Sequence, residues 1–334
     1  MAVSTDNYTE SGVLLSGIAT TTFYFIQFSL FLLLIIPSIG CSLFALYWFF
    51  HDRNLRHALH NHVIIVLLVI NLFYELTDIA FIMHYFRTSE TFYLPLVFHM
   101  ILGFIDWTFY VVQCMLYAWV SFERHILIFH NDLLATTRKR ILLHYFPPIF
   151  IIVYCIVFHT ILFFASQCVN TYENISGVFM TPCALQNAAL YVYEISAHFI
   201  APIIIIIISS FTLLIRTIWQ KHRTQRQVDW RRYRKMTIQV LSISSLYGIF
   251  LFPFILMNFL FICNIPFDSG NAVFILAAYC PYYTLLLYPI VVIGSLPELR
   301  QKTMNIVHYF RHRRIVHALE LPMIRTGNNR LPTV

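Results

Sequence analysis

Residues 200–215 have the sequence IAPIIIIIISSFTLLI and contain no charged side chain. A helix formed by this stretch is apolar on nearly all of its faces, whereas a helix at the surface of a soluble protein keeps one polar face. Helices that are apolar all round lie in the core of a large protein or in lipid. The stretch therefore favours a helix that crosses a membrane.

The composition of the whole chain agrees with this interpretation. Of its 334 residues, 59% are hydrophobic and 11% are charged, and the mean hydropathy is +0.71. Soluble domains carry about 25% charged residues, so this chain has too few to cover a globule with polar surface. The composition argues against a water-soluble enzyme, and it is not that of a disordered chain, a collagen or a coiled coil.

Seven apolar runs occur along the chain. A bilayer core about 30 Å thick requires roughly 20 apolar residues of helix. The runs cover residues 23–50, 62–85, 95–122, 141–165, 188–215, 236–263 and 271–294. The first run is too long for a signal peptide, and residues 1–22 before it contain no Lys or Arg. We predict an all-α integral membrane protein built as a seven-transmembrane helix bundle.

Lys and Arg indicate the orientation of these helices, because cytoplasmic connections carry an excess of them. Of the 22 Lys and Arg residues, all except Arg87 lie on the same side of the predicted bundle. They lie in the connections 51–61, 123–140 and 216–235 and after Leu299. We therefore expect a multi-pass plasma-membrane protein with its N-terminus outside and its C-terminus inside. Contact with anionic membrane lipid accounts for the basic charge, and no nucleic-acid partner is expected.

Features of extracellular loops fall on the predicted outer side. Glycosylation motifs of the form N-x-[ST] begin at Asn7 and Asn174, which makes a glycoprotein the expectation. Cys168 and Cys183 flank the second motif and are candidates for a disulfide that closes this loop. Cys263, near the outer end of the sixth run, is an alternative partner.

Four carboxyl groups lie inside the runs, namely Glu75, Asp78, Asp106 and Glu194. Ionisable groups at membrane depth are costly and are functional candidates by default. The runs contain no Lys or Arg to neutralise these acids. The absence of a membrane Lys also argues against a retinal pigment, which needs a Lys for its Schiff base.

The membrane histidines do not follow a metal-binding spacing. They stand singly on different runs, without an H-x-x-x-H or H-E-x-x-H motif: His84, His99, His159 and His198. Seven-helix zinc hydrolases need His and carboxylate ligands spaced along helix faces. We therefore interpret these histidines as hydrogen-bonded packing residues and expect neither a metal nor a cofactor.

The inner end of the third run carries Glu123-Arg124-His125. Taken alone, an acid and an Arg at the boundary of the lipid also fit an ion pair at a helix end whose side chains extend toward water. Three prolines lie in the later runs, Pro202, Pro253 and Pro289, and the amphipathic segment Glu298-Leu299-Arg300-Gln301-Lys302 follows them. In this order and spacing, residues 23–305 resemble a rhodopsin-like (class A, family 1) seven-transmembrane G-protein-coupled receptor, in particular a divergent, orphan-type invertebrate member.

The resemblance implies a division of the chain and a set of roles. Residues 1–22 would be an extracellular segment, 23–295 the receptor bundle, 296–309 an amphipathic eighth helix and 310–334 a cytoplasmic tail. Glu123-Arg124-His125 matches the family's Asp/Glu-Arg-Tyr motif, which implies that Glu123 neutralises Arg124 at rest and that Arg124 later meets a heterotrimeric G protein. The three prolines match the family's helix hinges.

The chain also departs from the family's pattern. Tyr288-Pro289-Ile290-Val291-Val292 stands in place of Asn-Pro-x-x-Tyr, and Leu251 replaces the tryptophan two residues before Pro253. Asn71 stands at the position of the sodium-binding aspartate, and His99 at that of the third-helix cysteine. The family's sodium site, tyrosine switch and loop-to-helix disulfide are therefore not implied for this chain.

Asp106 is the leading candidate for contact with an extracellular ligand. It precedes Arg124 by 18 residues, or five helical turns, so both lie on one helix face about 27 Å apart. By the resemblance, Asp106 matches the aspartate that binds the ammonium group in amine receptors. Tyr282 matches a tyrosine that often bonds to this aspartate.

Further residues are candidates for the same ligand site. The acids Glu75, Asp78 and Glu194 lack internal counter-ions, so an entering cationic amine or peptide would supply the missing charge. Five aromatic residues are candidates for the lining of the cavity, namely Trp107, Tyr110, Tyr191, Tyr193 and Phe254, although the sequence favours core packing for each one taken alone. The acids are also consistent with neutral carboxyl groups hydrogen-bonded between helices. A small-solute or ion transporter or channel is the alternative function, although the sequence shows no internal repeat; no enzyme is predicted.

Overall fold

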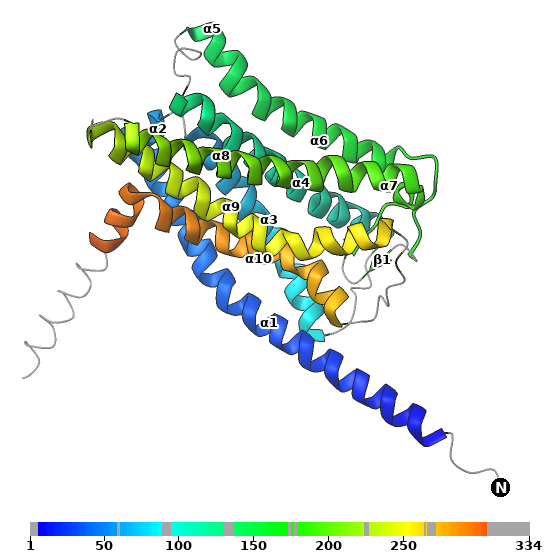
Figure 1. The fold of residues 1–334 in the computed structure, drawn as a ribbon. Helices are drawn as coiled ribbons and strands as arrows, with labels where there is room; N and C mark the ends of the chain where they lie inside the picture. Colours follow the sequence, from blue (N-terminus) through cyan, green and yellow to red (C-terminus); the bar gives the residue numbers. More distant parts are fainter. Residues whose placement is uncertain are drawn as a thin grey trace, which may run out of the picture.

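The computed structural model describes residues 6–58, 61–88, 95–129, 136–172, 175–176, 179–223, 227–263, 265 and 272–305. Within these ranges the fold is a bundle of long helices, with one two-stranded ladder in a connection (Figure 1). The long helices are α1 (Asp6–His51), α3 (His62–Thr88), α4 (Leu96–Phe129), α6 (Phe146–Phe164), α8 (Ala201–Arg223), α9 (Gln227–Ile262) and α10 (Ala272–Ser295). Shorter helices are α2 (Arg53–His57), α5 (Thr137–Arg140) and α7 (Ala188–Ile195).

Seven helical segments among the described residues are long and apolar enough to cross a membrane, which confirms the predicted number. They are Thr21–His51, His62–Thr88, Leu96–Ile126, Thr137–Phe164, Ala188–Trp219, Thr237–Ile262 and Leu276–Ser295. The fourth and fifth are composite. A π-helical turn over Ile141–Tyr145 joins α5 to α6, and another over Ser196–Ile200 joins α7 to α8.

Helix α1 is longer than we predict from the sequence. It begins at Asp6, within the segment 1–22 that we assign to the extracellular side, and runs for 46 residues. At 1.5 Å per residue this is about 69 Å, more than twice the thickness of a bilayer core. No proline interrupts residues 6–36, so the helix continues beyond the apolar run. Figure 1 shows its N-terminal part extending away from the other helices.

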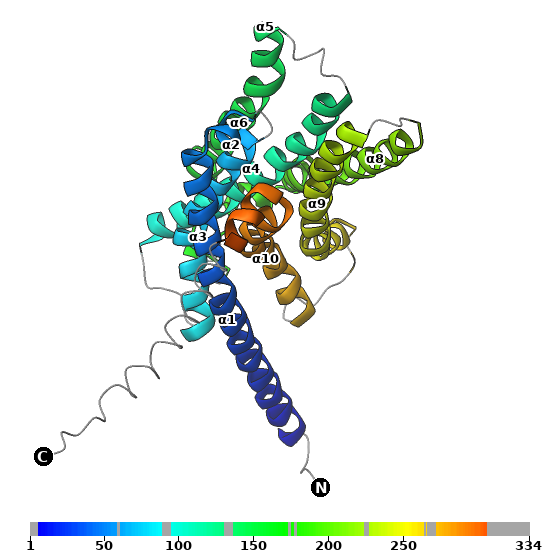
Figure 2. The same ribbon diagram turned by 90° about the vertical axis from the view of Figure 1, so that its left-hand side faces the viewer.

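Helix α4 occupies the centre of the bundle and contacts α3, α6, α8 and α9. Helix α10 packs against α1, α3 and α9 (Figure 2). The rings of Tyr117 on α4 and Tyr247 on α9 stack with centroids 4.7 Å apart. The Tyr117 hydroxyl donates a hydrogen bond to the Val240 carbonyl oxygen at 2.9 Å. Aromatic and polar contacts therefore fix α9 against the central helix.

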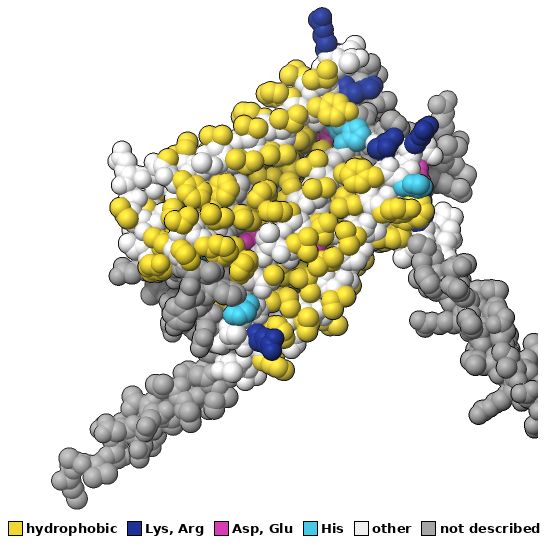
Figure 3. All heavy atoms as spheres, turned by 180° about the vertical axis from the view of Figure 1, so that it is seen from behind, with side chains coloured by type: hydrophobic (Ala, Val, Ile, Leu, Met, Phe, Trp, Pro, Cys, Tyr) yellow, Lys and Arg dark blue, Asp and Glu magenta, His cyan; other side chains and the backbone are white. Residues whose placement is uncertain are grey.

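The outer surface of the bundle is mostly apolar. Figure 3 shows a wide hydrophobic band, with Lys and Arg side chains gathered mainly at one end, which we call the basic end. Large apolar side chains point outward from several helices, for example Leu33, Ile149 and Ile208, each at least 60% exposed. Soluble monomers rarely expose continuous apolar surface of this kind. The distribution is that of a multi-pass membrane protein.

Lys302, near the end of the described chain, contacts the end of α1 and the residue between α1 and α2 at the basic end. Residues 297–305, within the predicted amphipathic segment 296–309, are helical. The Lys302 ammonium lies 2.6 Å from Asp52 Oδ2 and 3.8 Å from the centre of the Trp48 ring. The hydrogen bond from Lys302 lowers the pKa of Asp52 below its ordinary value. The segment 310–334 lies outside the described residues.

A disulfide joins Cys168 to Cys183, as predicted, with their Cα atoms 6.1 Å apart. Between them the strands β1 (Ile175–Ser176) and β2 (Phe179–Met180) pair antiparallel. Cys263, the alternative partner, is a free cysteine. The predicted glycosylation sites cannot be compared, because Asn174 and the side chain of Asn7 lie outside the described residues.

Strand β2 rests on a glycine of α4. A Cβ atom added at Gly103 would lie 2.5 Å from the Met180 carbonyl oxygen and 3.0 Å from a ring carbon of Phe163. We therefore expect Gly103→Ala to destabilise the protein by about 1–3 kcal/mol, the usual cost of overpacking. Thermal unfolding of the purified protein in detergent measures this loss. Gly248→Ala is the matched control, because a Cβ there meets no atom within 4 Å; equal melting temperatures for the two variants would contradict the close contact.

Candidate functional site

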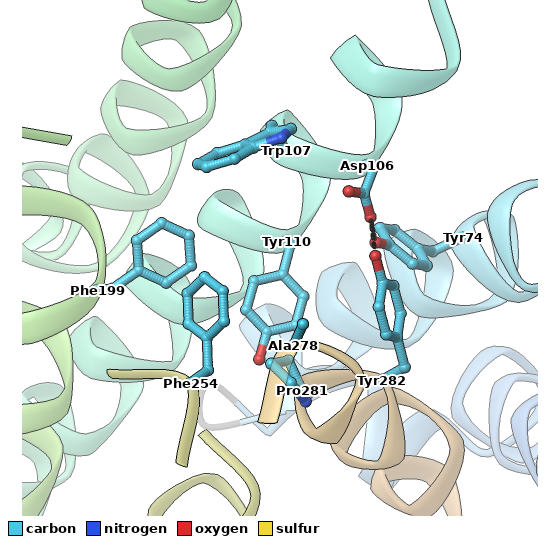
Figure 4. A pocket seen from close by; sticks show the side chains of 9 residues that line it. All are labelled: Tyr74, Asp106, Trp107, Tyr110, Phe199, Phe254, Ala278, Pro281 and Tyr282. Carbon is cyan, nitrogen blue, oxygen red and sulfur yellow. Dashed lines mark hydrogen bonds between the residues drawn. The ribbon is translucent and has the colours of Figure 1, made fainter. Parts of the chain in front are cut away.

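A cavity of about 90 Å³ opens between α3, α4, α9, α10 and the π-helical turn Ser196–Ile200 (Figure 4). Its lining is largely aromatic and contains one carboxyl group. The lining residues are Tyr74, Asp106, Trp107, Tyr110, Phe199, Phe254, Ala278, Pro281 and Tyr282. Asp106, Trp107, Tyr110, Phe254 and Tyr282 were expected here from the sequence.

Two tyrosines hold the Asp106 carboxyl group. The hydroxyl groups of Tyr74 on α3 and Tyr282 on α10 both donate hydrogen bonds to Asp106 Oδ1 on α4, that of Tyr282 at 3.0 Å (Figure 4). The contact between Asp106 and Tyr282 is the one that we expected, whereas Tyr74 was not foreseen. The three residues connect three helices at one oxygen atom, so the position of the carboxyl group depends on how these helices pack.

Aromatic rings form the opposite wall of the cavity. The rings of Tyr110 and Phe199 are stacked with centroids 6.1 Å apart, and that of Trp107 stands perpendicular to Phe199 at 6.2 Å. Phe254 of α9 lies 5.3 Å from Phe199 between ring centroids. Such faces attract cations within about 6 Å. Phe199 was not predicted, because the π-helical turn that carries it changes which side chains face inward.

Asp78 supplies a second carboxyl group close to the first. It lies one turn after Tyr74 on α3, is completely buried, and interacts electrostatically with Asp106. Neither of its oxygen atoms has a hydrogen-bond partner among the described residues. No Lys or Arg lines the cavity. Two neighbouring carboxyl groups without a cationic side chain favour the uptake of a positive charge, either a proton on one of them or a bound cation.

The other two membrane acids lie elsewhere. Glu75 accepts hydrogen bonds from Ser38 on α1 and from the Asn71 amide, the latter at 2.9 Å. Glu194 is buried against His159 and His198. Neither acid lines the cavity, and neither do the predicted aromatics Tyr191 and Tyr193. For Glu75 the structure favours our alternative interpretation, a carboxyl group hydrogen-bonded between helices.

At the basic end, Glu123 and Arg124 contact different helices. Glu123 is hydrogen-bonded to Nδ1 of His144 in the turn before α6, and Arg124 donates to Gln239 Oε1 on α9 at 3.2 Å. The resemblance implies that Glu123 neutralises Arg124 at rest. Glu123 acts electrostatically on Arg124, while these two hydrogen bonds join the residues to different helices. Consecutive residues on a helix do not face each other, so the acid points toward α6 and the guanidinium toward α9.

His125, the third residue of the motif, bonds to the Ser209 carbonyl oxygen on α8 through Nε2 at 2.6 Å. The motif thus contacts helices on three sides of α4. His144 was not predicted as a partner of Glu123, since nothing in the sequence around residue 144 marks it.

The three predicted hinge prolines occupy different settings. Pro202 follows the π-helical turn Ser196–Ile200 and cannot donate a hydrogen bond to the His198 carbonyl four residues earlier, which accounts for the widened turn. Pro253 and Pro289 lie inside α9 and α10. Pro253 precedes Phe254, so a bend at this position would move a residue of the cavity wall.

The chain matches no family model, and no curated protein matches it.

Proposed function

We propose that the protein is a receptor that couples binding of a small cationic ligand at the cavity to a heterotrimeric G protein at the basic end. The observation that supports it most is the Asp106 carboxyl group, held by two tyrosine hydroxyls in an aromatic-lined cavity with Asp78 beside it. An ammonium group would pair with Asp106 and lie against the aromatic wall. The resemblance to rhodopsin-like receptors supports the same assignment.

The size of the cavity favours a small amine over a peptide. Its volume of about 90 Å³ is below the roughly 300–1,000 Å³ of drug-sized sites, although it exceeds the 10–15 Å³ or so that one water needs. An ammonium head with a short substituent fits this space. A larger ligand would have to displace aromatic side chains such as Trp107.

Two helices connect the cavity with the basic end. Helix α4 carries both Asp106 and Arg124, and α9 carries both Phe254 and Gln239. A ligand that binds more tightly when α9 has moved away from α4 shifts the bundle toward that arrangement. This movement would break the bond between Arg124 and Gln239 and make the guanidinium accessible to a G protein.

The orientation of the bundle is part of the proposal. Positive charge near the Arg124 end supports an inner position for that end and a plasma-membrane location with the N-terminus outside. The disulfide and both glycosylation motifs then lie outside, and residues 297–305 form part of an eighth helix at the inner leaflet. The basic connection 216–235 would contact the G protein and anionic lipid.

Removal of the Asp106 charge tests the ligand site. We expect Asp106→Asn to weaken the most potent agonist from a screen of small amines at least tenfold, since hydrogen-bonded ion pairs of this kind contribute about 1.5–3 kcal/mol. Tyr282→Phe should have a smaller effect, because it removes one of two hydroxyl donors. Nucleotide exchange on a co-expressed promiscuous G protein gives the potency.

Glu75→Gln is the matched control, because this buried acid lies outside the cavity. Unaltered potency in Asp106→Asn, or an equal loss in Glu75→Gln, would contradict the assignment of Asp106 to the ligand.

Replacement of Arg124 tests coupling. Arg124→Ala should abolish ligand-dependent nucleotide exchange while the protein remains at the cell surface, and Gln239→Ala should raise exchange in the absence of ligand because Arg124 loses its partner on α9.

The acids Asp78 and Asp106 inside the bundle also suit a transporter or channel. Solute or ion flux without nucleotide exchange would support that alternative and contradict the receptor.

A further inference from the structure

Two histidines and one glutamate form a buried cluster between α6 and the junction of α7 with α8. Glu194 Oε1 lies 3.2 Å from His159 Nε2, and Glu194 Oε2 lies 2.6 Å from His198 Nδ1. The side chains of all three residues are at most 1% exposed. None of them lines the cavity around Asp106, so the cluster requires an explanation of its own.

The hydrogen bonds of His159 show where its proton lies. His159 Nδ1 is 2.8 Å from the Cys155 carbonyl oxygen, which can only accept, so Nδ1 carries a hydrogen. In a neutral imidazole the other nitrogen is then an acceptor. In the neutral ring His159 Nε2 thus directs a lone pair at a carboxylate oxygen, so either a proton, which makes the ring an imidazolium, or a metal ion must lie between the two atoms.

His198 has a corresponding arrangement. Its Nε2 lies 2.9 Å from the Tyr154 hydroxyl, so an N–H there can donate outward while the Nδ1 lone pair points at Glu194. Histidines that bind metals characteristically use one nitrogen for the metal and donate the other N–H to an outer partner. Cys155 and Tyr154 provide such partners for His159 and His198, respectively.

The three ligand atoms converge closely enough to share one ion. One nitrogen of each histidine and one carboxylate oxygen all lie within 4.8 Å of one another. Ligand atoms around a tetrahedral zinc ion, with bonds of about 2.0–2.1 Å, are separated by roughly 3.4 Å. A small contraction of the cluster would therefore bring them to bonding distance.

The local backbone supports this position as a built site. His198 lies in the π-helical turn Ser196–Ile200, and π turns within helices occur frequently at functional sites. The turn brings His198 and Glu194 to the same side, against His159 of α6. His159 is five residues from the end of α6 at Phe164, or about 7.5 Å along the helix.

We propose that His159 Nε2, His198 Nδ1 and the Glu194 carboxylate bind a Zn²⁺ ion that links α6 to the α7–α8 junction. Imidazole and carboxylate ligands suit zinc, whereas Ca²⁺ and Mg²⁺ prefer oxygen ligands alone. Three protein ligands leave a fourth position for water. The inference does not depend on the receptor proposal. From the sequence we expect no metal, because these ligands come from two different runs and neither run carries a metal-binding motif.

Zinc binding to the purified full-length protein in detergent tests the proposal. With its metal removed and its free thiols alkylated, the protein should take one Zn²⁺ per chain from a chromophoric chelator, with a dissociation constant in the micromolar range or below. His159→Ala, His198→Ala and Glu194→Gln should each lower the affinity at least tenfold. His144→Ala is the matched control: it removes a buried histidine that also bonds to a glutamate, Glu123, but lies outside the cluster.

X-ray absorption of the zinc-loaded wild-type protein keeps the proposal testable if these variants fail to fold. We expect nitrogen and oxygen neighbours at about 2.0–2.1 Å with the outer-shell signal of imidazole. Absence of bound zinc, sulfur neighbours at about 2.3 Å, or wild-type affinity in both His159→Ala and His198→Ala would overturn it.

Discussion

The hydrogen bonds from Tyr74 and Tyr282 to Asp106 connect α3, α4 and α10 at a single carboxyl group. Lipid offers no water to a charged or polar group in this part of the bundle. Side chains of neighbouring helices must therefore form the hydrogen bonds of such a group. Tyrosine hydroxyls stabilise Asp106 without neutralising it. The carboxyl group therefore remains able to attract a cation, and in the receptor proposal binding of a cation would change the packing of the three helices. Both the receptor proposal and its ligand class follow from this constraint.

The membrane acids are accommodated in three different ways. Glu75 Oε1 accepts hydrogen bonds from a hydroxyl and an amide, as part of the packing between α1 and α3. Glu194 lies between two histidines, a set of ligands that suits a metal ion. Asp106 lines an aromatic cavity without a cationic side chain, and Asp78 interacts with it electrostatically from outside the lining. The sequence made all four acids candidates for the ligand site, with Asp106 the leading one, and their partners on other helices now separate them.

Some of these features follow from the sequence because they depend on properties along one segment. Apolar length predicts the seven helices, and the positions of Cys168 and Cys183 around one loop predict their disulfide. The contact of Tyr282 with Asp106 follows only from the resemblance. The partners His144 of Glu123 and His159 of Glu194 depend on how separate helices are rotated against each other, and two π-helical turns alter that rotation at Ile141–Tyr145 and Ser196–Ile200. The spacing of residues within a single run therefore does not predict these contacts.

The receptor proposal requires that the Asp106 end of the bundle faces the exterior and the Arg124 end faces the cytoplasm. Antibody labelling of an epitope placed within residues 310–334, in intact and in permeabilised cells, measures this most directly. The account predicts labelling only after permeabilisation, together with labelling of an N-terminal epitope in intact cells. Labelling of the 310–334 epitope in intact cells would place the basic end outside and contradict the receptor.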